Sequence, residues 1–167
     1  MSQYGIRRDG SYYTRILWCS HTENDPMLWV NNLINDDVTR NGGTWGAHTM
    51  GPANVVLDFF GEEQTVGKIA LFCNVGVTIS ILEELAKTVR IYTCDTDEPL
   101  KLRTAQDDIN GVDWKLLAEL TTEKKEGWQE FAVAPTKAKF IRLELVENHG
   151  TPPELDWTEM NEVKFYA

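Results

Sequence analysis

The three histidines are the residues of this chain best suited to metal binding or proton transfer. His21, His48 and His149 lie far apart in the sequence, so they would share a site only if the fold brought them together.

The chain lacks a Gly-x-Ser-x-Gly elbow, a His-Glu-x-x-His pair, a phosphate-binding glycine loop and a dinucleotide fingerprint. The adjacent acids at 62–63 and 107–108 fall in turns, where we expect them to be solvated. A glycosidase would need two acids facing each other across a cleft, which the sequence leaves open, but the residues favour a binding protein over an enzyme.

The composition predicts one globular domain. The chain has 167 residues, 42% of them hydrophobic, with six Trp, six Phe and five Tyr, which is enough to build a sizeable core. The formal net charge of −10 repels phosphate backbones and anionic lipid head groups. Nucleic acid is therefore excluded as a partner and a membrane surface is disfavoured.

The cysteines and the N-terminus bear on the compartment. Cys73 and Cys94 each end an apolar run and are read as small core residues, and with Cys19 they make an odd count. A complete disulfide framework is not expected, although one bridge remains open. Residues 1–11 form a polar, flexible lead-in without the apolar core of a signal peptide. The expected location is cytoplasmic if the chain is complete, and extracellular or cell-surface if it is an excised module.

The pattern of short strands and long polar loops predicts an all-β fold. In residues 140–145, Phe140, Arg142 and Glu144 alternate with Ile141, Leu143 and Leu145, which predicts a strand with one buried face. Helical spacing predicts one or two helical turns at 27–34, and 74–87 has a mixed pattern. The expected strands are 12–19, 54–60, 66–73, 88–94, 114–120, 128–133, 138–146 and 159–166. Such strands indicate a two-sheet β-sandwich, and their irregular spacing favours a jelly roll, with 12–167 as a single domain.

The order of several motifs resembles a known family. Asn54 to Gly61 reads Asn-Val-Val-Leu-Asp-Phe-Phe-Gly, and Asn110 to Trp114 reads as a turn before a tryptophan. A Trp-x-x-Phe strand at 128–131, Ala-Lys-Phe-Ile-Arg-Leu at 138–143 and Asn-Glu-Val-x-Phe-Tyr at 161–166 follow. Together they resemble the discoidin domain, or coagulation factor 5/8 type C domain, of the galactose-binding-like superfamily, which overlaps the family 32 carbohydrate-binding modules. The resemblance covers about 12–166 and implies a jelly-roll sandwich with ligand loops at one end.

The resemblance also implies a structural calcium ion. The family's metal loop reads roughly Asp-Gly-Asp-x-x-Thr-x-Trp, and here Asn35-Asp36-Asp37 and Thr44-Trp45 align with it after an insertion. An aspartate replaces the glycine, and aspartate tolerates positive φ better than most residues. Calcium takes about six to eight oxygens. The implied ligands are Asp36, Asp37, Thr44, loop carbonyls and the terminal-strand Glu162; alternatively, the aspartates only cap and solvate a turn.

Ligands in this family are held by loops at one end of the sandwich, which correspond here to 20–26, 42–51, 74–81 and 148–157. Sugars need an aromatic face and planar polar groups. The implied ligand-binding residues in these loops are His21, Trp45, His48, Asn74, Asn148, His149 and Trp157. Trp45 also fits a core position beneath its loop, and Trp18, Trp29, Trp114 and Trp128 are expected in the core.

The sequence predicts two alternative functions. The first is a non-catalytic, lectin-like module that binds a terminal sugar, supported by calcium and by repetition in a larger assembly or oligomer. The alternative is a protein–protein interaction or structural module that uses the same loops. The apolar stretch 75–81 matches the lipid-inserting spikes of some family members, but the charge of −10 argues against a membrane.

Overall fold

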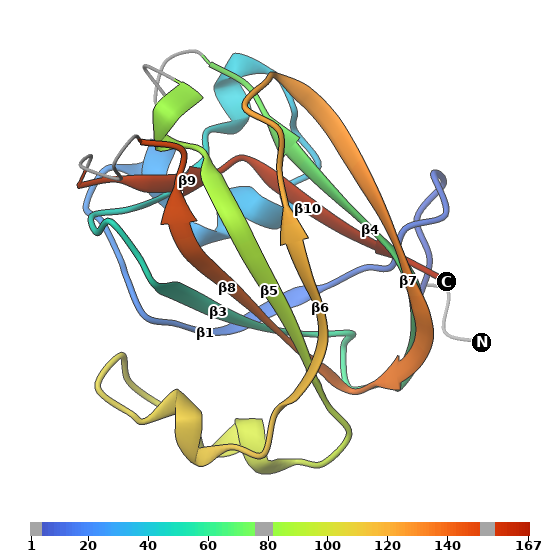
Figure 1. The fold of residues 1–167 in the computed structure, drawn as a ribbon. Helices are drawn as coiled ribbons and strands as arrows, with labels where there is room; N and C mark the ends of the chain where they lie inside the picture. Colours follow the sequence, from blue (N-terminus) through green and yellow to red (C-terminus); the bar gives the residue numbers. More distant parts are fainter. Residues whose placement is uncertain (1–4, 76–81, 151–155) are drawn as a thin grey trace.

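The computed structural model describes residues 5–75, 82–150 and 156–167 and shows an antiparallel β-sandwich (Figure 1). The larger sheet has the order β1 (Arg15–Cys19), β3 (Ala53–Asp58), β8 (Phe140–Asn148), β5 (Ala86–Cys94) and β6 (Lys115–Thr121). The smaller sheet has the order β10 (Glu162–Tyr166), β4 (Gln64–Cys73) and β7 (Gly127–Ala138). A short ribbon pairs β2 (Trp45–Ala47) with β9 (Thr158–Met160). The predicted all-β sandwich is confirmed.

The hydrophobic core lies between the two sheets because alternate residues of each strand point inward. Ile141, Leu143 and Leu145 of β8 are fully buried on this side. The facing sheet contributes Ile69, Leu71, Val163 and Phe165. Trp45 of β2 has no exposed surface and also packs in this core.

β8 is buried on both faces, so the prediction of a single buried face was wrong. Arg142 and Glu144 are only 5% and 8% exposed. The Arg142 guanidinium donates to Asn54 Oδ1 at 2.9 Å, to Asn110 Oδ1 at 3.1 Å and to Glu144 Oε2 at 3.1 Å, and it lies over the Tyr92 ring. A charged side chain can be buried when its hydrogen bonds are met in this way, and alternation alone does not reveal such partners.

Segment 95–113 supplies the cover for this second face. It contains the 3₁₀ turns η5 (Glu98–Lys101) and η6 (Ile109–Gly111). Ile109 packs on Trp18 and Val56, and the indole N–H of Trp18 donates to the Thr104 carbonyl at 2.6 Å. The predicted loop is therefore folded against the outer face of the five-stranded sheet, at the lower end of Figure 1.

The predicted strands match the observed ones to within three residues at most ends, but β7 continues to Ala138 instead of ending at 133, and β2 lies where a loop was expected. Two further differences are informative. The expected strand 159–166 divides into β9 and β10 at Asn161, whose side chain bonds to a neighbouring loop instead of continuing one ladder. The expected helical turns at 27–34 are the 3₁₀ turns η1 (Pro26–Leu28) and η2 (Val30–Ile34), and Asp25 caps η1 by accepting from Met27 N–H at 3.0 Å. Two further 3₁₀ turns are η3 (Arg40–Gly42) and η4 (Leu82–Glu84).

Two of the tryptophans expected in the core are at the surface. Trp29 is 49% exposed and Trp128 is 39% exposed, whereas Trp18 is buried and Trp114 is half-buried. Trp29 lies between two 3₁₀ turns and donates to the Glu23 carbonyl at 2.9 Å. Trp128 lies on the outward face of β7 and packs against Phe72. Adjacent strand and helix patterns therefore did not identify which face these side chains occupy.

The expected flexible lead-in is packed in its described part. Ser11 is fully buried and its hydroxyl donates to Asp9 Oδ1 at 2.6 Å. Asp9 in turn accepts from the buried ammonium of Lys164 on β10. Residues 5–11 therefore cover the outside of the smaller sheet, which their polar composition did not indicate.

Other sequence expectations concern the cysteines and the membrane. Cys73 and Cys94 are buried as predicted, and Cys19, Cys73 and Cys94 are all free thiols. None of the helices in the described part of the chain is long and apolar enough to cross a membrane. The apolar stretch at 76–81 and the proline-containing stretch at 151–155 lie outside the described residues.

Replacing Arg142 by methionine should destabilise the fold by about 3 kcal/mol, because it leaves Glu144 and Asn54 buried with fewer partners. Urea denaturation measures this change. Lys139→Met removes an exposed ion pair to Asp97 and should stay within about 0.5 kcal/mol of the parent. Equal effects of the two substitutions would contradict the structural role of the buried network.

Candidate functional site

The loops predicted to bind a ligand gather at one end of the sandwich. β1 ends at Cys19 opposite Val55 near the start of β3, and β8 ends at Asn148 opposite Ala86 at the start of β5. β9 lies beside β2 at the same end, shown at the top of Figure 1. The described parts of segments 20–26, 42–51, 74–81 and 148–157 therefore share one surface.

Buried polar side chains hold these loops in place. Asn148 is fully buried, donates to the Trp157 carbonyl at 3.1 Å and accepts from Gly150 N–H at 2.9 Å. Asn161 donates to the Gly43 carbonyl at 3.1 Å and accepts from Asn74 N–H at 2.9 Å. Asn148, expected to contact a ligand, is thus a brace between loops, and Asn74 is held by its backbone.

The most exposed group of predicted site residues is a stacked pair of rings. His48 and Trp157 stack with ring centroids 4.6 Å apart and an interplanar angle of 16°. His48 Nε2 lies 3.0 Å from Asp156 Oδ2, and the Asp156 side chain is 73% exposed. The hydrogen bond from His48 lowers the pKa of Asp156, so this carboxyl is ionised at neutral pH. Sequence reasoning found both rings but missed Asp156.

The other two histidines are half-buried and separately bonded. His21 Nδ1 lies 2.6 Å from Ser20 Oγ, and His149 Nε2 lies 2.8 Å from Thr122 Oγ1. Burial is the largest cause that lowers the pKa of each imidazole, so both are neutral at neutral pH. Within residues 5–75, 82–150 and 156–167, no three His, Cys, Asp or Glu side chains converge to hold a metal ion.

Trp45 cannot act as a stacking surface for a ligand. Its ring has no exposed area, and its indole N–H donates to the His21 carbonyl at 3.3 Å. Trp45 therefore takes the core position that the sequence offered as its alternative: β2 points Trp45 and Ala47 into the core, and Gly46 on the other face lies against Leu28 and Glu159. The residue supports the loop above it.

The loop aligned with the family's metal site has the backbone shape that the alignment requires. Asp36 has φ of 58°, the region normally favoured by glycine, and its N–H donates to Glu162 Oε2 at 3.2 Å. Asp36 Oδ1 accepts from Lys164 Nζ at 2.6 Å. Asp37 instead caps its own turn by accepting from the N–H and hydroxyl of Thr39. Thr44 is fully buried next to Trp45.

Glu162 is the residue of this loop region that most needs a partner. Its side chain has no exposed surface, and Oε1 has no hydrogen-bond partner among the described residues. Burial raises the pKa of Glu162 to about 8, against the opposing effect of the Asp36 N–H. An unpartnered buried carboxylate oxygen fits a cation ligand, because desolvated charge is costly unless paired.

A second buried acid, Glu159 on β9, was not anticipated. It is 2% exposed, and Oε2 lacks a hydrogen-bond partner among the described residues. Burial, followed by the nearby carboxyl of Glu84, raises the pKa of Glu159 to about 9. Sequence alternation gave no signal here, because the β2–β9 ribbon buries Thr158, Glu159 and Met160 alike.

Comparison with solved structures identifies the fold. No protein-family model and no curated protein matches the sequence. Among solved structures, the third family 32 module of a family 31 glycoside hydrolase from Clostridium perfringens has a TM-score of 0.69 at 11% identity, covering 100% of this chain and 99% of that one. The chain has the fold of the family 32 carbohydrate-binding modules.

Two further structures with the family 32 fold agree. A C. perfringens module solved in complex with GalNAc-β-1,3-galactose has a TM-score of 0.67 at 12% identity, covering 93% of this chain and 96% of that one. The module of Streptococcus pneumoniae EndoD has a TM-score of 0.65 at 16% identity, covering 92% and 94%. The fold expected from the sequence motifs is therefore confirmed.

Replacing Glu159 by glutamine should flatten the pH dependence of stability. The folded chain keeps the Glu159 proton up to about pH 9, whereas an unfolded glutamate releases it near 4.5. The folded state therefore binds one more proton between these values, and its stability falls as pH rises. Between pH 5 and pH 8 the variant should gain about 4 kcal/mol of stability relative to the parent, about 1.4 kcal/mol for each pH unit, measured by urea denaturation across this range.

The matched control is Glu63→Gln, because Glu63 is exposed in the turn after β3. This variant should follow the parent at every pH. Parallel curves for Glu159→Gln and the parent would show that Glu159 does not carry the extra proton.

Proposed function

We propose that this chain is a non-catalytic carbohydrate-binding module whose loop end holds a sugar. The observation that carries this proposal is the stack of the exposed His48 on the half-buried Trp157, beside the exposed Asp156, at the end of a family 32 fold. The solved C. perfringens module in complex with GalNAc-β-1,3-galactose supports the ligand class. The buried position of Glu159 supports a non-catalytic role, since its carboxyl is not presented to a substrate.

The recognition we infer combines a flat apolar surface with planar polar groups. The C–H face of a pyranose packs against an aromatic ring, and its hydroxyls bond to the imidazole of His48 and the carboxylate of Asp156. The stack and the Asp156 bond restrict both rings before a ligand arrives, which reduces the entropy lost on binding. A shallow site of this kind binds one sugar weakly, and several copies in an assembly would add avidity.

We also propose that calcium binds between the 35–44 loop and β10. Glu162 would provide its unpartnered Oε1, and Asp36, whose N–H already bonds to Glu162, lies beside it. Asp37, Thr44 and loop carbonyls are the further ligands that the family resemblance implies. A bound calcium ion would neutralise the buried carboxylate and fix the loop to β10. The positive φ of Asp36 supports this, because the replaced glycine position keeps its backbone shape.

A protein partner is the second candidate. Trp29 and Met50 are 49% and 50% exposed. Met50 lies in segment 42–51, and Trp29 bonds to the Glu23 carbonyl of segment 20–26. Exposed large apolar side chains are common at protein interfaces. The same loops would then dock a protein surface instead of a sugar.

Trp157→Ala should abolish sugar binding and leave the fold intact. The parent is screened on a glycan array, and the affinity for the best glycan is then measured by calorimetry. Loss of the stacked ring should weaken binding by at least about tenfold. Phe60→Ala is the matched control, because Phe60 is 51% exposed in the turn at the opposite end. Binding that survives Trp157→Ala would contradict the site, and an array without any bound glycan would favour the protein partner.

Calcium should raise the thermal midpoint of the parent relative to the same protein in EGTA, since a ligand that binds only the folded state stabilises it. Glu162→Gln should remove this difference. In EGTA the variant should be at least as stable as the parent at pH 8, because it lacks the buried acid. Identical parent curves with calcium and with EGTA would show that the loop does not bind the metal.

A further inference from the structure

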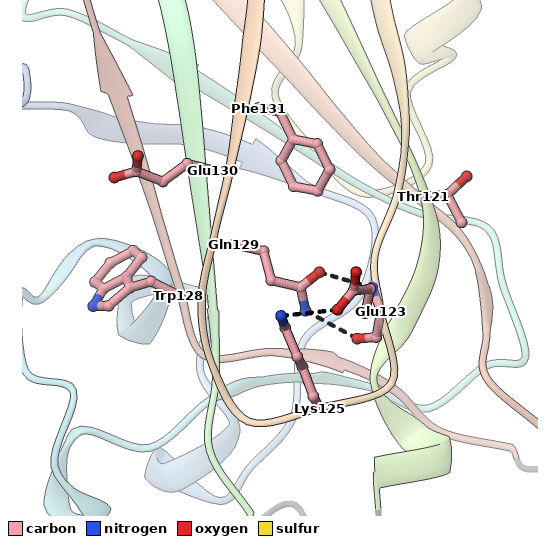
Figure 2. A pocket seen from close by; sticks show the side chains of 7 residues that line it. All are labelled: Thr121, Glu123, Lys125, Trp128, Gln129, Glu130 and Phe131. Atoms are coloured by element: carbon pink, nitrogen blue, oxygen red, sulfur yellow. Dashed lines mark hydrogen bonds and ion pairs between the residues drawn. The ribbon is translucent and has the colours of Figure 1, made fainter.

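A groove lies between β6 and β7, away from the stacked rings of the loop end. It has a volume of about 260 Å³ and is lined by Thr121, Glu123, Lys125, Trp128, Gln129, Glu130 and Phe131 (Figure 2). Gln129 and Phe131 lie on the inner face of β7, and Trp128 and Glu130 lie on the other side of its ribbon as a rim. The groove opens where the free edges of the two sheets adjoin.

Gln129 presents a fixed amide in this groove. Its Oε1 accepts from Glu123 N–H at 2.7 Å, and its Nε2 donates to the Glu123 carbonyl at 2.9 Å. A carboxamide has two N–H donors and two lone pairs. One donor and one acceptor therefore remain in the same fixed plane, the arrangement that suits two neighbouring hydroxyl groups.

The other lining residues complete the requirements for a sugar. Phe131 packs against the core and is half-buried, so its ring orientation is restricted. Figure 2 shows the Phe131 ring and the Thr121 side chain on opposite sides of the groove, with Gln129 and Glu123 below them. An aromatic face beside hydroxyl and amide groups matches the two kinds of surface on a pyranose.

Charge and size identify the class of occupant. The Lys125 ammonium lies 2.8 Å from Glu123 Oε2, so the groove holds paired charges in a chain of net charge −10. That balance disfavours an anionic ligand. The volume is below the roughly 300–1,000 Å³ typical of drug-sized ligands and suits one sugar ring.

We propose that the β6–β7 groove is a second binding site, for a single neutral pyranose. It borders the loop end, because Thr122 of the same turn contacts His149 and Lys124 pairs with Glu83 at 3.2 Å. Binding in this groove does not require the His48–Trp157 site, because the two share no lining residue. One chain would thus contact a glycan surface at two places, which strengthens attachment to a dense glycan.

A ¹H–¹⁵N NMR titration of the full chain tests this proposal, with galactose, glucose and N-acetylgalactosamine as probes up to high millimolar concentrations. At least one sugar should shift the Gln129 side-chain amide and the Thr121 and Phe131 backbone signals in a saturable way. The same shifts should persist in Trp157→Ala, which removes the loop-end ring. Glucuronate should produce weaker shifts, because of the net charge.

Two substitutions in the groove lining test which side chains contact the sugar. Thr121→Val keeps the strand shape and loses one hydroxyl, and Phe131→Leu keeps an apolar side chain and loses the flat face. Each should weaken the groove titration about fivefold, as expected for one lost polar or aromatic contact, and leave any shifts around His48 unchanged. Thr121 is exposed, so its variant tests the site even if Phe131→Leu disturbs folding.

The outcomes separate the two sites. Shifts around His48 without shifts at Gln129 and Thr121 would overturn the groove proposal and retain the loop-end site. Shifts at the groove alone would support the groove proposal and leave the loop-end site to the glycan array. No saturable shift at either place with any probe would overturn the groove proposal, and the glycan array on the parent then decides the loop-end function separately.

Discussion

Irregular loops can be placed at one end of a sandwich only if their backbone polar groups find partners away from water. In this chain, asparagine side-chain amides meet that demand. Asn32 donates to the carbonyls of Pro26 and Thr44 at 3.0 and 2.9 Å, and Asn35 donates to the Gly42 carbonyl at 2.7 Å. Asn148 and Asn161 join other loop pairs in the same way. The loop end is therefore a preformed surface, which is what weak recognition of a rigid sugar requires.

The same constraint explains why position 43 requires glycine. Gly43 has φ of 68°, and a Cβ at this position would lie 2.7 Å from Asn32 Nδ2. The amide of Asn32 can approach the backbone this closely only because no side chain intervenes. The position of Thr44 and Trp45, and hence of strand β2, which precedes His48, depends on this contact.

Buried acids are the main energetic cost of this end. Glu159 and Glu162 are both almost fully buried, and burial raises the pKa of each. Glu159 reduces the free-energy cost of its burial by keeping a proton beside Glu84. Glu162 accepts from the Asp36 N–H through Oε2, and its unpartnered Oε1 suits a cation. Two neighbouring acids are thus accommodated by different chemistry, a proton in one case and a proposed metal ion in the other.

The sequence predicted the fold well because strand alternation and motif order depend on local patterns. Binding by the loops and by the His48 and Trp157 rings stays a prediction, whereas Asn148 braces two loops and Trp45 takes the core position that was its alternative. Asparagines that contact a ligand and asparagines that brace a loop have the same local signature. Arg142, Glu159 and Trp128 were missed for a related reason, since the burial of Arg142 and Glu159 and the exposure of Trp128 depend on segments distant in sequence.

The central claim is that the loop end of this family 32 fold holds a sugar against the His48–Trp157 stack. A crystal structure of the chain soaked with GalNAc-β-1,3-galactose tests it most directly. The account predicts a sugar ring in contact with Trp157 and within hydrogen-bonding distance of His48 or Asp156. A well-occupied sugar bound elsewhere, with the two rings still stacked and free of ligand, would contradict it.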